Sequence, residues 1–282
     1  MMNSSEWVLR AILNRYPPAS RESLEQFLPE EERTRLDAMP SSPLETNVEE
    51  PSLLDRVHWS WLLPALESFS AREQKLFLCA LSSQTKETLA RELKIKTPPT
   101  EALNPIFQEF AVQTLSATVT GDPVHLLPVY FLPPTPLTPL LRLDKQQLVQ
   151  LIDTLSLHDL AVELRQIVET KILKKIYSFL SEEEKKSLKK AAAIKQPFSV
   201  SRLQLEKWNG TEKSLRTLLH KRGIARLGAA LSTQHPDFIW YICHQLDIGR
   251  GKTLAKFSES EVAKGASQAI IHQIEELLRE MS

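Results

Sequence analysis

Apolar residues recur at helical spacing along most of the chain, most clearly in residues 141–190. A period of about 3.6 residues gathers such side chains on one face of a helix. The spacing therefore predicts three short amphipathic helices in a row, at residues 144–155, 157–169 and 171–180. Helices of this kind bury their apolar faces only by stacking on one another, which builds a binding surface more often than a catalytic pocket.

The same pattern returns near the C-terminus. The pattern over residues 211–231 predicts a helix, a turn and a second helix. Pro236 is expected in the first turn of a third helix. A last helix is expected over residues 259–281, with Ser258 and Glu261 as its capping box. Since no segment has a convincing strand pattern outside the apolar proline-rich one, we expect an all-α protein with a helical-repeat C-terminal half.

The N-terminal half predicts a smaller helical region. Short helices are expected at residues 5–16 and 20–38, and residues 39–52 have the Pro, Ser and Glu content of a linker. Residues 53–115 form a helical domain with a break at Pro64 and a capping box at Ser70 and Glu73. Prolines then crowd residues 116–140, which predicts an extended connector to the domain at residues 141–282.

Charge is balanced overall but not along the chain. The 282 residues hold 35 Lys and Arg and 35 Asp and Glu, which argues against a general nucleic-acid binder. Residues 1–60 carry a net charge of −5 and residues 141–282 one of +6. These parts could attract each other or meet different partners, or they could be ordinary solvated helix faces.

The remaining composition predicts a cytosolic protein without cofactors. Cys79 and Cys243 lie in apolar helical contexts typical of buried free thiols. There is no apolar run long enough to span a membrane and no secretory signal pattern. No histidine has metal-ligand spacing to a partner, so we expect no metal site.

The C-terminal half resembles the flagellar motor switch protein FliG, a family built from armadillo-like helix sets. The resemblance is carried by Leu143-Asp144, by the turn at Ser156–Ala161, and by the segment LRTLLHKRGIARLGAALS with the helices that come after it. It covers residues 140–281. Gly210–Lys213 stand where that family has paired acidic residues, and the Glu-His-Pro-Gln element of its middle domain has no match.

These departures favour the related export machine, the type III secretion injectisome, over a rotating motor. The resemblance then implies an SctK-class accessory protein, a non-catalytic adaptor between the inner-membrane ring and the cytosolic sorting platform. Such an adaptor would sit at the cytosolic face of the inner membrane through its partners, without insertion and without nucleic acid. The alternatives are a flagellar FliG-type component, a regulator or chaperone of secreted proteins and, last, a hydrolase.

Several residues are candidates for partner binding. Trp59 and Trp61 are two positions apart, so a helix would place one in the core and leave the other for a partner. The basic cluster of residues 185–190 either complements a helix dipole or docks an acidic partner, and Arg222 with Arg226 forms a solvated face or a carboxylate-binding ridge. That cluster consists of Lys185, Lys186, Lys189 and Lys190.

The segment Gly249-Arg250-Gly251-Lys252-Thr253 suggests a phosphate-binding loop, but Leu246 stands where that motif needs its first glycine. We expect Gly249 to end a helix instead. No Gly-x-Ser-x-Gly or Cys/His nucleophile pattern is present, so no catalytic residue is predicted.

Overall fold

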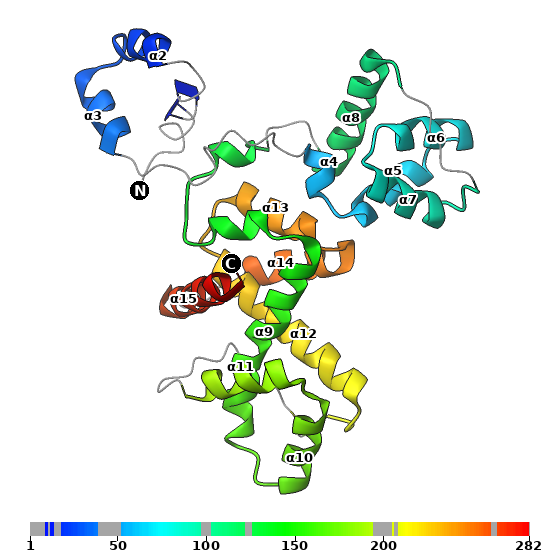
Figure 1. Cartoon of the computed structure of the whole chain (residues 1–282), viewed down its shortest axis with the longest axis vertical. Helices are drawn as coiled ribbons and strands as arrows, with labels where there is room; N and C mark the ends of the chain where they lie inside the picture. Colours follow the sequence, from blue (N-terminus) through cyan, green and yellow to red (C-terminus); the bar gives the residue numbers. More distant parts are fainter. Residues whose placement is uncertain are drawn as a thin grey trace. The chain divides into compact units, whose positions relative to one another are not determined.

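All regular structure in the computed structural model is helical wherever the chain is described, which confirms the predicted all-α class (Figure 1). The described residues are 9–10, 12–13, 18–38, 52–96, 103–121, 126–193, 205, 208–260 and 264–281. Two compact units divide the chain, one of residues 1–138 with 235–238 and one of 139–234 with 239–282. No helix in these ranges is long and apolar enough to cross a membrane.

The first unit consists of short helices. Its elements are α2 (Pro18–Glu25), α3 (Glu30–Ala38), α4 (Leu53–Arg56), η1 (Trp59–Trp61), α5 (Leu63–Glu67), α6 (Ala71–Cys79), α7 (Ser83–Glu92), α8 (Pro105–Thr120) and η2 (Val129–Phe131), with η3 (Thr138–Arg142) at the boundary. Its main core gathers fully buried leucines from α5 to α8, among them Leu66, Leu78, Leu89 and Leu115. The predicted capping box opens α6, where Ser70 and Glu73 bond each other's backbone N–H.

Prolines in this unit act differently from the prediction. Pro64 lies in the first turn of α5, where its missing N–H costs no intrahelical bond, so it does not break a helix. The interruption lies instead at Val57 and His58. In place of the single helix predicted at residues 20–38 there are two, α2 and α3, which are separated by residues 26–29.

The predicted connector begins later than expected, because α8 continues to Thr120. After it come two 3₁₀ turns rather than extended chain alone: η2 lies between Pro128 and Pro133, and η3 contains Pro139 near its start. The predicted helix at 5–16 is described only at residues 9–10 and 12–13, which are helical, and residues 39–51 of the predicted linker lie outside the described residues.

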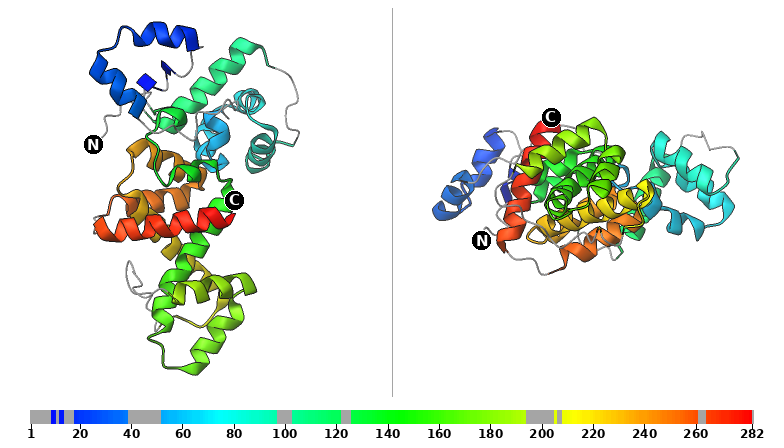
Figure 2. Two further views of the ribbon diagram at one scale, coloured as in Figure 1. Left: turned by 60° about the vertical axis from the view of Figure 1, so that its left-hand side comes forward. Right: turned by 90° about the horizontal axis from the view of Figure 1, so that it is seen from below.

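The second unit is organised around two long helices, α9 (Lys145–Leu164) and α12 (Glu212–Leu231), which lie side by side (Figures 1 and 2). Against this pair pack α11 (Glu182–Ala192), α14 (Ile248–Ser258) and α15 (Lys264–Met281), while α10 (Thr170–Phe179) precedes α11. Figure 2 shows α15 crossing the pair steeply. The remaining helix is α13 (Pro236–Gln245), which begins at the predicted proline.

Two predicted interruptions in this pair are absent. Residues 144–155 and 157–169 were expected as separate helices, but α9 runs through Leu155, Ser156 and Leu157, all of which are buried. The helix, turn and second helix predicted over residues 211–231 are one continuous helix, α12. Gly223 is there for close approach, because a Cβ at this position would lie 1.8 Å from the Ile152 carbonyl oxygen on α9.

Two predicted helix ends are also wrong. Gly249 is the second residue of α14 and does not end α13, because the Asp247 carboxylate caps the following helix first. Ser258 is the last residue of α14 and its hydroxyl donates to the Ala255 carbonyl, so it does not cap the final helix. In the described residues that helix begins at Lys264.

Replacing Gly223 by alanine tests the close contact of α9 and α12. We expect Gly223→Ala to lower the free energy of unfolding by about 1–3 kcal/mol or more, since backbone must move to admit the methyl group. Gly265→Ala in α15 is the matched control, because its Cβ would meet nothing within 4 Å. The control should be neutral or stabilising by up to about 1 kcal/mol in urea titrations. Equal effects of the two substitutions would contradict this packing.

Two half-buried histidines predict an acid-sensitive fold. Burial lowers the pKa of His158 to about 4, with help from the nearby Arg226 charge, and burial likewise lowers the pKa of His244 to about 4. The unfolded chain binds these protons near pH 6.5, so the folded state loses stability as the pH falls from about 6.5 to about 4. Urea midpoints across this range should therefore fall with pH. A His158→Gln, His244→Gln variant with an unchanged slope would contradict this origin.

Candidate functional site

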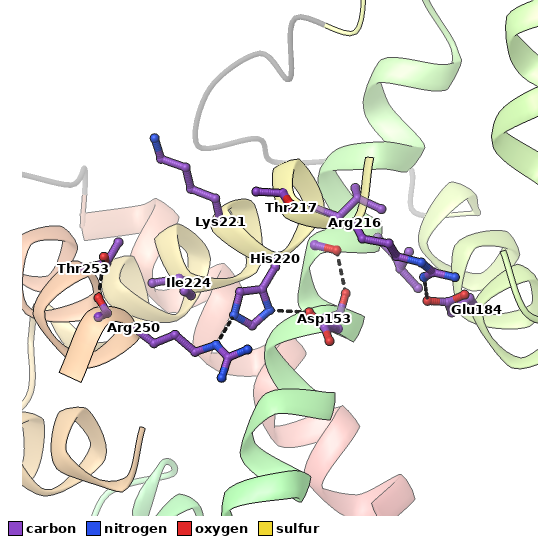
Figure 3. A pocket seen from close by; sticks show the side chains of 13 residues that line it. Asp153, Glu184, Arg216, Thr217, His220, Lys221, Ile224, Arg250 and Thr253 are labelled. Atoms are coloured by element: carbon purple, nitrogen blue, oxygen red, sulfur yellow. Dashed lines mark hydrogen bonds and ion pairs between the residues drawn. The ribbon is translucent and has the colours of Figure 1, made fainter. Parts of the chain in front are cut away.

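The candidate site is a groove of about 500 Å³ in the second unit, which we call the α12 groove. Its thirteen lining residues come from α9, α12 and α14, with Glu184 from α11 (Figure 3). Along α12 the lining runs from Arg216 to Ile224, two turns or about 12 Å of helix axis. Its floor includes three buried apolar side chains, Leu157, Leu219 and Ile224, so the groove combines an apolar floor with charged walls.

A chain of polar contacts joins three helices across the groove (Figure 3). His220 of α12 lies 2.6 Å through Nδ1 from Asp153 Oδ1 of α9. On its other side, Arg250 Nε of α14 donates to His220 Nε2 at 2.8 Å. The same guanidinium uses Nη1 to bind Asp247 Oδ2, also at 2.8 Å.

These contacts fix the protonation of the imidazole. A guanidinium has no acceptor, so His220 Nε2 must accept from Arg250 and the ring proton lies on Nδ1, facing Asp153. A carboxylate behind an imidazole resembles part of a catalytic triad. Here, however, the Nε2 lone pair that a general base would use is occupied by Arg250. The arrangement thus favours a clamp between helices over a proton acceptor.

The hydroxyl groups along the groove are engaged as well. Thr217 donates to the Lys213 carbonyl at 2.9 Å and Thr253 to the Gly249 carbonyl at 2.8 Å. Both bonds lie within their own helices, as threonines in helices commonly arrange them. Neither hydroxyl is held by the His220 imidazole, so the groove lacks the paired geometry of an activated nucleophile at these two residues.

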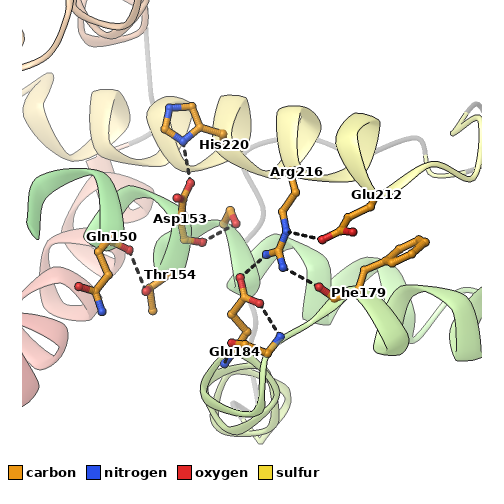
Figure 4. Close-up of polar contacts among 10 residues, drawn as sticks. Gln150, Asp153, Thr154, Phe179, Glu184, Glu212, Arg216 and His220 are labelled. Carbon is orange, nitrogen blue, oxygen red and sulfur yellow. Dashed lines mark hydrogen bonds and ion pairs between the residues drawn. The ribbon is translucent and has the colours of Figure 1, made fainter. Parts of the chain in front are cut away.

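Arg216 is the first α12 residue of the groove lining. Its guanidinium binds Glu184 at the start of α11, donates at 2.5 Å to the Phe179 carbonyl at the end of α10, and lies 3.7 Å from Glu212 (Figure 4). Burial opposes ionisation of Glu184, but the bonds from Arg216 and from the Ser181 backbone outweigh it and lower the pKa of this carboxyl. Ser181 and Glu184 form a capping box at the start of α11, and the glutamate also anchors α12 through Arg216.

Asp247 caps the helix that supplies Gly249, Arg250 and Thr253 to the groove, and it explains the glycine-rich segment. Its carboxylate accepts the N–H groups of Gly249 and Arg250, each at 3.1 Å. Burial works against its charge, yet these bonds and the Arg250 charge lower the pKa of Asp247. The first free N–H groups of α14 are therefore satisfied by the protein's own carboxylate, which leaves little for a phosphate at the Gly249–Thr253 segment.

The predicted arginine ridge does not form. Arg226 is fully buried, with its Nη1 2.5 Å from Asp159 Oδ1 and its Nη2 2.5 Å from Gln273 Oε1. It ties α12 to α9 and α15 and is not accessible to a partner, so it is withdrawn from the partner-binding candidates. Arg222 is half-buried and lies apart from the groove lining.

The predicted lysine cluster lies on α11. Lys186 and Lys189 are exposed, whereas Lys185 is paired with Glu182 and Lys190 with Glu280 of α15. Lys185 and Lys190 are thus held in ion pairs within the protein. Lys186 and Lys189 remain predicted contacts for a partner. Trp59 and Trp61 lie in η1, not in an α-helix, and both are half-buried; Trp59 packs against the core of the first unit.

Sequence reasoning missed the α12 groove because its parts are distant in the chain. Asp153 and His220 are 67 residues apart, and His220 and Arg250 are 30 apart. The available signal was the face of one helix, where Arg216, His220 and Ile224 recur every four residues. Among the described residues, no group of three or more His, Cys, Asp or Glu is arranged to hold a metal ion.

Comparison with known proteins found no similar protein. Neither the models of protein families, nor the curated proteins, nor the solved structures contain a match to this chain.

The buried pair of Arg226 and Asp159 should matter far more than an exposed one. We expect Asp159→Asn to lower the free energy of unfolding by about 3–5 kcal/mol, since it leaves a buried guanidinium without its counter-charge. Glu280→Gln breaks the exposed pair with Lys190 and should cost at most about 1 kcal/mol. Chemical denaturation of both variants checks the contrast. Similar losses would show that the buried pair contributes no more to stability than the exposed one.

Proposed function

We propose that this chain is a non-catalytic adaptor that binds other proteins through its helical second unit. The observation that carries the proposal is the α12 groove, with buried Leu157, Leu219 and Ile224 at its floor and charged side chains along its walls. Concave sites of this composition suit a partner's side chains, with apolar contact for affinity and a few polar groups for orientation. Two contacts between helices, Arg216 with Glu184 and Arg250 with His220, hold the groove in shape before a partner arrives.

The finer proposal places the adaptor in a type III secretion apparatus, between the cytosolic domain of the inner-membrane ring and the platform or stator proteins. It rests on the resemblance of residues 140–281 to FliG. In that comparison the acidic pair of the motor helix is missing, and Glu212 is the one acidic residue in the first turn of α12. An injectisome component of the SctK class fits this better than a flagellar switch component. Recruitment to the membrane would then come from the ring proteins.

A second candidate is a regulator or chaperone of secreted proteins. It is favoured by an apolar surface on α8, where Ile106 is 80% and Phe110 55% exposed. The two side chains are four residues apart, on one helix face. Apolar surface of this kind mostly marks an interaction site, and exposed apolar segments of unfolded substrates would suit it.

Affinity capture of the full-length tagged chain from its own host separates these proposals. An adaptor should capture ring and platform proteins, and Ile106→Ser, Phe110→Ser should leave this capture within about twofold of wild type, because α8 is not the proposed contact. Secreted proteins captured in place of ring and platform proteins, and lost in that variant, would instead establish the chaperone role. Restored motility in a strain lacking FliG would favour the flagellar role. Capture of none of these would refute the adaptor proposal.

A further inference from the structure

The charged side chains that line the α12 groove are mainly cationic, with Arg216, Lys221 and Arg250 beside two carboxylates, Asp153 and Glu184. Both carboxylates already bind protein groups: Asp153 binds His220 through Oδ1, and Glu184 binds Arg216 and the Ser181 backbone N–H. By contrast, Lys221 is exposed and forms no ion pair with any residue in the described ranges. A ligand group placed here meets a net supply of N–H donors.

Arg250 adds to this supply. Its Nε binds His220 (Figure 3) and its Nη1 binds Asp247, and these two bonds hold the guanidinium plane in place. The third nitrogen, Nη2, makes no hydrogen bond to any residue in the described ranges. A pre-positioned guanidinium edge loses little freedom on binding an anion, so it suits a carboxylate.

The floor requires an apolar group beside that anion. Leu157, Leu219 and Ile224 line the groove with only 2%, 4% and 3% of their surface exposed, so a ligand side chain that lies over them gains close packing contact more than exclusion of water. The two turns of α12 span about 12 Å, a length matched by three or four residues of extended chain at about 3.3 Å each. A single small anion would leave most of this length empty.

We propose that the α12 groove binds a peptide segment of a partner protein in which acidic and apolar residues alternate closely. Lys221 and Arg250 pair with its carboxylate, and an adjacent apolar side chain lies on Leu157, Leu219 and Ile224. The net charge of +6 on residues 141–282 adds long-range attraction for such a segment. This inference rests on the proposed adaptor function and specifies the chemistry of its partner.

Charge reversal at Lys221 tests the proposal against a matched control. The probe is a short fluorescein-labelled peptide in which Leu, Glu and Ser repeat, compared with the same peptide carrying Gln for Glu. The wild-type chain should bind the Glu peptide at least about tenfold more tightly by fluorescence anisotropy. Lys221→Glu should weaken it by a similar factor, while Lys252→Glu, an equal charge change at an exposed residue of α14 outside the lining, should change it by less than about twofold.

Folding is monitored in both variants by circular dichroism and thermal unfolding, and the two surface substitutions should leave these unchanged. Hydrogen exchange with bound peptide should show added protection over residues 216–224. Equal affinity for the Gln peptide, an equal loss in Lys252→Glu, protection confined to other residues, or no binding by the wild-type chain would each overturn the groove proposal.

The outcome is separable from that of the adaptor proposal. If Lys221→Glu loses the peptide but captures ring and platform proteins as wild type does, the groove is not the adaptor's contact and the inference fails while the adaptor stands. If the wild-type chain binds the peptide and captures no such protein, the type III adaptor proposal fails and the chemistry of the groove stands.

Discussion

The second unit depends on how closely α9 and α12 approach each other. At Gly223 the two backbones come so near that no side chain fits between them, and Gly228 makes a similar approach to Phe257 of α14. Beside the first contact, Arg226 is enclosed with Asp159 and Gln273, which joins α12 to α9 and α15. Close backbone contact supplies dispersion energy, and the enclosed ion pair tolerates only one register of the helices. Everything else in the unit is arranged around this pair.

The α12 groove is a consequence of the same packing. Because α9, α12 and α14 are fixed relative to one another, Asp153, His220 and Arg250 reach each other from three separate helices. Arg216 does the same for α10, α11 and α12. These contacts between helices therefore shape the groove, and they leave the donors of Lys221 and Arg250 Nη2 available to a ligand. Rigidity favours the proposed role of the groove as a docking site, because a preformed site loses less conformational entropy when a partner binds.

Local signals were read correctly from the sequence where local chemistry decides the structure. The capping box at Ser70 and the first-turn Pro236 each open the expected helix, because the bonds concerned lie within a few residues. Other local signals were misjudged, since Pro64 fits the first turn of α5 and Asp247 caps α14 just before Gly249. The remaining errors fall where tertiary packing overrides local preference. Ser156 and Gly223 resemble breaks between helices but are buried inside α9 and α12. Arg226 resembled a surface residue because its partner, Asp159, is 67 positions away. The groove was unpredictable for the same reason.

The central claim is that partners are held in the α12 groove. The most direct measurement is photocrosslinking in the host cell, with a benzophenone side chain introduced at Thr217, an exposed residue of the groove lining. We predict covalent adducts with a ring or platform protein from this position and few from Lys252, which lies outside the lining. Adducts from Phe110 on α8 with secreted proteins, and none from Thr217, would contradict the claim.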